Sequence, residues 1–255
     1  PSEFGKLIQL SELLLSNNQL SGFVPYELGY LTQLQSLYLN SNSLVGEIPS
    51  ELGQLSQLRE LFLSNNQLSG SIPRELGNLT HLTKLNLFYN MLSGTIPSEF
   101  GKLTKMMNLE LSMNRLTGTI SSELGNLMML KTMNLWNNML SGTIPSELGK
   151  LTQLTDLQMH INQLRGNIPS KLGNLMKVTT LFLENNVLTG TIPSEMGNLS
   201  FMAYLDLSEN YLNGTIPIRL GNLEQLVRLF LVNNALFGEI PTEFGKLKKL
   251  TELKM

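Results

Sequence analysis

Apolar residues recur along this chain in a pattern that repeats every 24 residues. One full unit runs from Leu61 to Lys84 and reads LFLSNNQLSGSIPRELGNLTHLTK. Shifting the frame by 24 residues in either direction reproduces the same positions of leucine, asparagine, glycine and proline along the whole chain, without insertions. Residues held at one fixed period predict a stack of identical coils, in which each coil buries its apolar side chains against its neighbours.

Each unit contains a short alternation that predicts a β-strand. In Leu61-Phe62-Leu63 the two leucines point inward, and Glu60, Phe62 and Ser64 point outward onto an exposed surface. Equivalent strands are expected to pair in parallel at about 4.8 Å, so that eleven of them form one sheet. Because strands stack more closely than the opposite wall can, we expect the sheet on the concave side of the stack.

A turn with asparagine follows each strand. Asn66 offers one acceptor and two donors, which suffice to bond backbone groups of its own coil and the next one. Asn66 and nine other asparagines in register with it predict a buried hydrogen-bonded ladder. Leu68 and Ile72 are expected to point inward, and Gly70 between them allows a tight bend.

The second half of each unit predicts a 3₁₀ or loosely helical wall. Pro73 suits a turn or the first residue of a helix, and Leu76, Leu79 and Leu82 are spaced by three and are expected to be buried. The residue after the proline is serine in most units, with glutamate next. We expect these serines to act as helix N-caps, with the glutamates stabilised by the helix start; examples are Ser50, Ser98 and Ser146.

Composition narrows the function classes. Charged residues make up 15% of the chain and the formal net charge is -2, which excludes a strongly basic nucleic-acid binder. No window has the ~18 consecutive apolar residues typical of a membrane span, so any membrane attachment would lie in segments outside this sequence. Cysteine is absent, which excludes thiol catalysis and disulfides within the chain.

Catalytic and metal-binding motifs are not found. The two histidines, His81 and His160, have no cysteine beside them, so a zinc site is not expected. Gly-Lys-Leu occurs at Gly101, Gly149 and Gly245, but none continues as a phosphate-binding loop. We therefore expect a non-enzymatic protein without a cofactor.

The repeated pattern LxxLxLxxNxLxGxIPxxLGxL resembles the plant-specific class of leucine-rich repeats, found in receptor-like kinase ectodomains and polygalacturonase inhibitors. The regular GTIPSELGxLTxL run from Gly142 to Leu154 is also similar to algal, diatom-type relatives. The resemblance implies an α/β repeat solenoid, a right-handed superhelix with a parallel concave sheet and a 3₁₀ or short helical convex side. It also implies an extra short strand at the Gly-x-Ile position, and binding of a protein, peptide or small ligand on the concave or lateral face.

The domain organisation is expected to be simple. Residues 1–255 are predicted to form a single leucine-rich repeat domain of about ten 24-residue repeats. The paired-cysteine caps of the family are missing, and the chain opens and stops inside a unit, which predicts a fragment of a longer protein. No insertion interrupts the period, so the island domain of some family receptors is not expected.

The candidate binding residues are outward strand positions and their edge. Eight aromatic residues lie there, which is the composition of a binding hot spot. Trp136, His160 and Glu184 are expected to stand in one column on successive coils. The alternative is that cross-strand aromatics simply stabilise the sheet. The candidates for ligand binding on the concave face are Tyr38, Phe62, Phe88, Tyr89, Glu110, Asn134, Trp136, Gln158, His160, Phe182, Glu184, Tyr204, Asp206 and Phe230.

A second surface is predicted beside the glycine of each unit. Hydroxyl pairs recur there at coil spacing, as in Ser93-Gly94-Thr95 and Thr117-Gly118-Thr119, and are interrupted by Arg165 and Asn167. A flat threonine ladder is similar to ice-binding faces of some β-solenoids, and it is equally compatible with a lateral protein contact. The simpler interpretation is that β-branched threonine suits an extended segment.

Three sequons, at Asn78, Asn198 and Asn213, predict sites of N-glycosylation. The first two are expected on the back wall, where a glycan leaves the sheet clear, although asparagine is common in that column in any case.

The main hypothesis is a protein or peptide interaction module of a secreted or cell-surface, receptor-like protein. The runner-up is a structural or adhesive component of an extracellular matrix or filament, with possible lateral self-association. Ice binding comes third.

Overall fold

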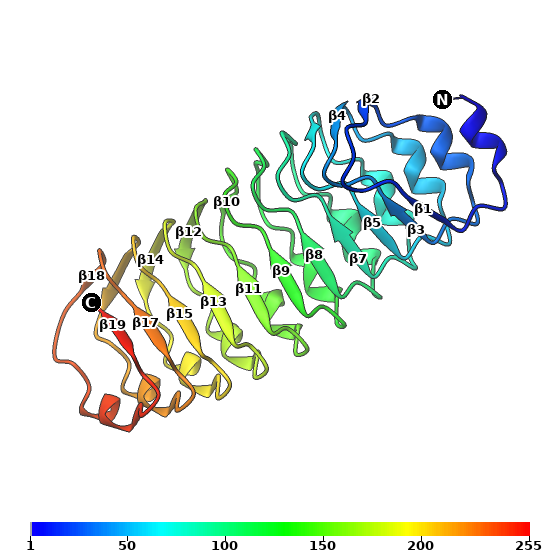
Figure 1. Cartoon of the computed structure of the whole chain (residues 1–255). Coiled ribbons are helices and arrows are strands. Elements are labelled where there is room, and N and C mark those ends of the chain that lie inside the picture. The colour runs from blue at the N-terminus through cyan, green and yellow to red at the C-terminus, as the bar shows by residue number, and fades with distance from the viewer. Residues whose placement is uncertain (1) are drawn as a thin grey trace.

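The structure is a computed structural model, and it describes residues 2–255. The coils stack along one long axis, with one strand of each coil facing the same side (Figure 1). These strands form an 11-stranded parallel sheet in which every neighbour is the strand of the next coil. The expected solenoid with a long parallel sheet is confirmed.

The strands of the long sheet are three residues each, because a single Leu-x-Leu alternation separates the turns at either end. Their register is constant, as in the pairing of Leu109 on one strand with Met133 on the next. In sheet order they are β1 (Glu12–Leu14), β3 (Ser36–Tyr38), β5 (Glu60–Phe62), β7 (Lys84–Asn86), β8 (Asn108–Glu110), β9 (Thr132–Asn134), β11 (Asp156–Gln158), β13 (Thr180–Phe182), β15 (Tyr204–Asp206), β17 (Arg228–Phe230) and β19 (Glu252–Lys254).

The opposite wall is built from 3₁₀ helices of five residues, as the spacing of three predicts. In η5 the Phe100 N–H donates to the Pro97 carbonyl at 3.1 Å and the Leu103 N–H donates to the Phe100 carbonyl at 2.9 Å. The helices are η1 (Ser2–Lys6), η2 (Tyr26–Tyr30), η3 (Ser50–Gln54), η4 (Arg74–Asn78), η5 (Ser98–Lys102), η6 (Ser122–Asn126), η7 (Ser146–Lys150), η8 (Ser170–Asn174), η9 (Ser194–Asn198), η10 (Ile218–Asn222) and η11 (Thr242–Lys246).

The expected serine N-caps are wrong. In η5 the cap position is held by Pro97, with extended φ of -61° and ψ of 129°, and Ser98 is already the first helical residue. The Ser98 hydroxyl faces the neighbouring Glu99 carboxylate at 3.5 Å and makes no cap hydrogen bond. Proline takes this place because its fixed φ matches the extended cap geometry and its carbonyl accepts the first helical bond. Ser50 and Ser146 occupy the same position.

Shorter parallel sheets run along the flank, beside the glycine of each unit. A 3-stranded sheet joins β2 (Ser21–Phe23), β4 (Ser43–Gly46) and β6 (Gln67–Leu68), and a 5-stranded sheet joins β10 (Ser141–Gly142), β12 (Gln163–Asn167), β14 (Val187–Thr191), β16 (Tyr211–Gly214) and β18 (Ala235–Leu236). Isolated bridges such as Thr95 to Thr117 span the coils between them. The expected extra strand is therefore present, although it is reduced to single bridges in the middle of the stack.

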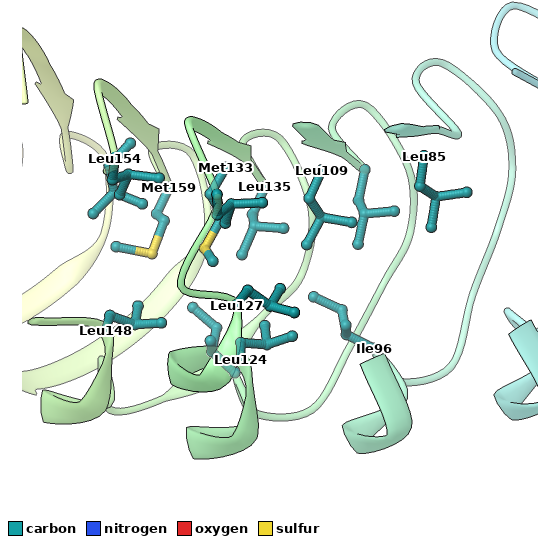
Figure 2. Packing of buried hydrophobic residues seen from close by; sticks show 14 of the residues in the cluster. Leu85, Ile96, Leu109, Leu124, Leu127, Met133, Leu135, Leu148, Leu154 and Met159 are labelled. Atoms are coloured by element: carbon teal, nitrogen blue, oxygen red, sulfur yellow. The ribbon is translucent and has the colours of Figure 1, made fainter. Parts of the chain in front are cut away.

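The core lies between the long sheet and the helical wall. Met133 and Leu135 project from the strand side toward Leu124 and Leu127 on the helix side (Figure 2), and all four are fully buried. Met133 replaces a strand leucine without opening space, because its flexible side chain has a similar volume. Burial of each such side chain contributes about 1.5–3 kcal/mol, so the stack is held by many equal increments.

The asparagine ladder is confirmed. Asn138 donates from Nδ2 to the Leu111 carbonyl of the preceding coil and to the Leu135 carbonyl of its own coil, both at 3.1 Å. Its Oδ1 accepts the Leu116 N–H of the preceding coil at 3.0 Å. Each interior asparagine repeats this arrangement, so every bond that these side chains make between coils reaches backward along the stack. Asn18, in the first complete turn, is exposed and donates only to carbonyls of its own coil.

Candidate functional site

The outer face of the long sheet, called the sheet face below, presents three side chains from each coil. Side chains two residues apart on a strand point the same way, and the constant register places equivalent positions in columns. Asn134, Gln158 and Phe182 are direct partners on β9, β11 and β13. The candidates divide into the first column, Tyr204; the second column, Tyr38, Phe62, Glu110, Asn134, Gln158, Phe182, Asp206 and Phe230; and the third column, Phe88, Trp136, His160 and Glu184.

Four rings form a continuous row, called the central aromatic row: Phe88, Trp136, His160 and Phe182. The Phe88 and Trp136 ring centroids lie 6.2 Å apart. Trp136 stacks on His160 at 5.2 Å with an interplanar angle of 5°, and His160 meets Phe182 at 5.8 Å with an angle of 79°. All four side chains are half-buried, so that part of each ring remains open to solvent.

Phe88 and Trp136 meet although one coil lies between them. The intervening outward residue is Ser112, which is fully buried. Its hydroxyl donates to the Glu110 carboxylate, so the small side chain folds down and the two large rings close over it. Ser64 and Ser208 in the same column are buried as well, and the expectation that all outward positions are exposed is wrong at these serines.

The aromatic candidates nearer the N-terminus form a separate pair. Tyr38 and Phe62 pack edge to face with centroids 4.6 Å apart. The Tyr38 hydroxyl donates to the Glu60 carboxylate. This pair therefore satisfies its own polar group and has no ring contact with the central aromatic row among the described residues.

The aromatic candidates nearer the C-terminus are covered by cations of the chain itself. The Arg228 guanidinium lies 5.7 Å from the Tyr204 ring centroid, and the Lys254 ammonium lies 4.3 Å from that of Phe230. Such contacts contribute about 0.5–1 kcal/mol at exposed sites. The sheet face thus carries three aromatic groups, of which the central row has four rings in contact over several coils.

Carboxylates accompany the central row and bond to neutral donors. Glu110 accepts the Asn134 amide at 2.7 Å. Asp156, which the sequence did not single out, accepts the Gln158 amide at 3.0 Å, and burial raises the pKa of its carboxyl. Asp206 accepts the Ser208 backbone N–H at 2.9 Å. Asp156 was recognisable from the sequence only as one more outward residue, because its burial depends on the side chains of neighbouring coils.

His160 and Glu184 face each other on successive coils, as their shared column predicts. His160 Nδ1 lies 3.9 Å from Glu184 Oε1, which is too long for a hydrogen bond. Burial lowers the pKa of His160 to about 4 and raises the pKa of Glu184 to about 7, with the Asp206 charge adding to the latter. At neutral pH the imidazole is therefore uncharged, and the carboxyl is close to its midpoint.

Three polar atoms beside the central row are buried without a hydrogen-bond partner. They are Asn134 Oδ1, His160 Nδ1 and Glu184 Oε2, on three consecutive coils. A buried polar atom without a partner costs about 1–3 kcal/mol. Their side chains place hydrogen-bonding atoms beside flat rings, an arrangement that suits the binding of a polar partner.

Tyr89 lies at the edge of the sheet face. Its backbone has a φ of +53°, a left-handed conformation that a tyrosine rarely adopts, and its side chain is 54% exposed. The ring stays within 6.0 Å of Phe88, which connects the edge to the central aromatic row. The candidate residues are thus brought together in the centre and separated toward both ends.

The sequon asparagines are all exposed. Asn78 and Asn198 end η4 and η9 on the helical wall, away from the sheet face, as expected, and Asn213 lies in β16 on the flank. The structure thus leaves all three side chains accessible to modification.

The largest groove described on the flank, the metal-ligating side chains and the helices give no second candidate site among residues 2–255. A groove of 860 Å³ on the flank is lined by Pro73, Glu75 and equivalent residues of neighbouring coils, so it follows from the repeat itself. Among residues 2–255 no group of three or more metal-ligating side chains is found. Within the same range, none of the helices has the length and apolarity needed to cross a bilayer.

Comparison with known proteins identifies the repeat. A profile described as leucine-rich repeat region matches residues 1–119, and the leucine-rich repeat profile matches residues 129–151, 177–199 and 202–223. A leucine-rich repeat protein of Leptospira interrogans is 33% identical, with a TM-score of 0.75, over 100% of this chain and 69% of that one. The chain belongs to the leucine-rich repeat family. No curated protein matches it at the threshold applied.

Among solved structures, this leucine-rich repeat chain is similar to the plant peptide hormone receptor RGFR1 in complex with RGF2, at 38% identity and a TM-score of 0.97. It is also similar to a plant ice-binding protein, at 31% identity and a TM-score of 0.78, over 90% of this chain and 74% of that one. The match covers all of this chain but 41% of the RGFR1 chain, so the chain spans less than half of that receptor. The resemblance to plant receptor ectodomains is confirmed.

Proposed function

We propose that this leucine-rich repeat chain is a non-enzymatic module that binds a peptide or an extended protein segment along the sheet face. The observation that carries the proposal is the central aromatic row with its three unpartnered buried polar atoms. Partly open aromatic rings are typical binding hot spots, and a bound partner would supply the missing hydrogen bonds after a small movement of the rings.

The comparisons support the same function. RGFR1, the solved structure with a TM-score of 0.97, is a peptide hormone receptor and was solved with its peptide. We extend this to a secreted or cell-surface location for the present protein, which the three exposed sequons also favour. Mass spectrometry of the native protein should then find glycan on Asn78, Asn198 or Asn213.

The runner-up, a structural or adhesive element, makes no use of the central aromatic row. Its support is the near identity of successive coils, which would suit lateral association along the flank. Under that alternative, substitutions on the flank should reduce self-association, and substitutions on the sheet face should have no effect on any partner.

The test of recognition compares two variants that each lose one large ring. The probe is a library of random peptides displayed on phage, selected on the wild-type protein. We expect Trp136→Ala to lose the selected peptides and to keep the wild-type melting temperature. Phe201→Ala, which removes an exposed ring away from the sheet face, is the matched control and should retain them.

Loss of thermal stability together with binding in Trp136→Ala would instead assign the row to sheet stabilisation. Peptides that bind both variants equally, or the absence of any selected peptide, would overturn the proposal.

The third candidate function, ice binding, is favoured by the match to the plant ice-binding protein. The flank presents an exposed threonine column at coil spacing: Thr95, Thr119, Thr143, Thr191 and Thr215. Against it, Asn167 interrupts this column, and the Thr117 hydroxyl in the neighbouring one already faces the Gly94 carbonyl at 3.3 Å. A thermal-hysteresis assay decides: ice shaping that is lost in Thr119→Lys would establish this function, and its absence in the wild type would remove it.

A further inference from the structure

The centre of the sheet face carries carboxylates without cations. On the five coils from Asn108 to Ser208, the outward positions include four carboxylates and neither lysine nor arginine: the acids are Glu110, Asp156, Glu184 and Asp206. The only imidazole among these positions, that of His160, is uncharged at neutral pH because burial lowers its pKa to about 4.

Two carboxylates elsewhere on the same face, Glu60 and Glu252, are paired with cations of the chain. Glu60 lies 3.0 Å from the Lys84 ammonium, and Glu252 lies 2.7 Å from the Arg228 guanidinium. The four central carboxylates have no such ion pair among the described residues: three accept from amide or hydroxyl donors, and Glu184 Oε2 accepts from none. Lysine or arginine therefore occurs at outward positions on either side of the five central coils, on β7, β17 and β19, and is missing between them.

The aromatic rings follow the same division. Tyr204 and Phe230 lie under Arg228 and Lys254, whereas the rings of the central aromatic row have no lysine or arginine over them in the described chain. Ring faces attract cations, and carboxylates beside them hold the same cations by charge-assisted hydrogen bonds. Phe182 and Asp206 are direct partners on adjacent strands, so one cation can reach both.

We propose that the segment bound on the sheet face is basic, and that an arginine or lysine of the partner lies on Phe182 between the carboxylates of Glu184 and Asp206. This inference rests on the proposed function, and it adds the chemical class of the ligand. An acidic or purely apolar segment would leave the four carboxylates facing like charge or stripped of water without compensation.

The first experiment reads the composition of the ligand. Random peptides on phage are selected on the wild-type protein in low salt, and those that also bind Trp136→Ala are discarded. We expect the remaining peptides to be enriched in arginine and lysine. Peptides that depend on Trp136 but show no such enrichment would overturn the basic-ligand inference and leave the proposed function intact. If no peptide depends on Trp136, both fall.

The second experiment tests the charge at one position. The tightest selected peptide is synthesised with each arginine replaced by citrulline, which keeps the shape and removes the charge; where that peptide carries lysine, acetyl-lysine takes its place. We expect one replacement to weaken binding about 10- to 100-fold, the range for losing a hydrogen bond to a charged group. A neutral analogue that binds equally would overturn the inference.

The protein side is tested with isosteric variants. Glu184→Gln and Asp206→Asn together should weaken the basic peptide about tenfold or more and should weaken its neutral analogue little, because only the charged peptide uses the two carboxylates. Glu224→Gln, an exposed carboxylate outside the sheet face, is the matched control and should leave both affinities unchanged. Equal losses for the two peptides would assign Glu184 and Asp206 to the shape of the face, against the inference.

Discussion

His160 and Glu184 show how the environment of single residues sets their charge. They lie on successive coils, and in each the side chain is mostly covered, with 13% and 19% exposed. Burial disfavours the charged form of both, so it lowers the pKa of the histidine and raises that of the glutamate. The charged and polar neighbours of the pair are Asp206 and Ser208 on the coil after Glu184, and Gln158 on the coil of His160 itself.

These opposite pKa shifts predict that the free energy of unfolding of two variants depends on pH in opposite directions. In Glu184→Gln only His160 remains: its pKa is about 4 when folded and 6.5 when free, so the unfolded chain takes up the proton first. The free energy of unfolding should therefore fall as pH falls from 6.5 to 4. In His160→Gln only Glu184 remains: its pKa is about 7 when folded and 4.5 when free, so the free energy of unfolding should fall as pH rises from 4.5 to 7.

Urea unfolding at several pH values between 4.5 and 6.5 measures both slopes. The double variant supplies the baseline, since it keeps every other carboxylate of the chain. Single variants whose slopes match that baseline would show that burial does not shift the pKa values of His160 and Glu184 in solution.

At the scale of elements, the glycines of the 3₁₀ helices set how closely neighbouring coils approach. A Cβ added at Gly125 in η6 would lie 2.6 Å from the Glu147 backbone carbonyl of the next coil, closer than real contacts allow. The other interior helices repeat this close approach. The glycines of the 3₁₀ helices, such as Gly125, form one column that is required for the spacing between helices. The glycines of the flank, such as Gly118 with a φ of +76°, are required for the backbone conformation.

Alanine in the middle of this column and alanine at its last position should have different effects. Gly125→Ala should lower the free energy of unfolding by roughly 1–3 kcal/mol, the usual cost of overpacking. Gly245→Ala in η11, where an added Cβ meets nothing within 4 Å, should leave it unchanged or raise it by up to about 1 kcal/mol. Paired urea titrations measure both, and equal destabilisation by the two substitutions would contradict the spacing argument.

The elements that could be predicted correctly from the sequence are those determined by the residues of a single coil. The Leu61-x-Leu63 strand, the 3₁₀ wall after Pro73 and the backbone bonds of Asn66 depend on residue types that recur in every unit, so one unit determines them all. The serine caps failed because proline and serine compete for one position, and the pattern alone does not show which of them takes the extended conformation.

The binding face was predictable by column but not in detail. The shared column of Trp136, His160 and Glu184 follows from the period, and the structure confirms it. Closure of Phe88 and Trp136 over Ser112 depends on rotamers and on the size of a residue one coil away. The unpaired atoms and the division of ion pairs between ends and centre arise in the same way, from contacts between coils that no single unit encodes.

At the scale of the whole molecule, each coil contacts only its neighbours. Interior strands are covered on both sides, and Leu109 and Leu111 in and after β8 are 1% and 0% exposed. The equivalent Leu13 and Leu15 at β1 are only half-buried. The free energy of unfolding of such a stack is close to a sum over the interfaces between neighbouring coils. A first or last coil of this chain has one such interface, and an interior coil has two.

Hydrogen exchange should therefore be graded along the stack. The Leu111 N–H, which donates to the Asn134 carbonyl at 2.9 Å, should exchange far more slowly than the Leu15 N–H, which donates to the Tyr38 carbonyl at 2.8 Å. Because the two bonds have similar lengths, the difference isolates position in the stack. Mass spectrometry of peptic fragments measures it, and uniform protection from β1 to β19 would show instead that the chain unfolds as one cooperative unit.

The backward reach of the asparagine side chains also gives the stack a direction. Asn42 donates to the Leu15 carbonyl and accepts the Leu20 N–H of the preceding coil. Asn234 makes the same two bonds with Leu207 and Leu212. The two sides of a coil are consequently unlike: its asparagine side chain bonds to the coil behind it, and its own backbone groups bond to the asparagine of the coil ahead. Neighbouring coils can therefore continue this bonding only when both run in the same direction along the stack.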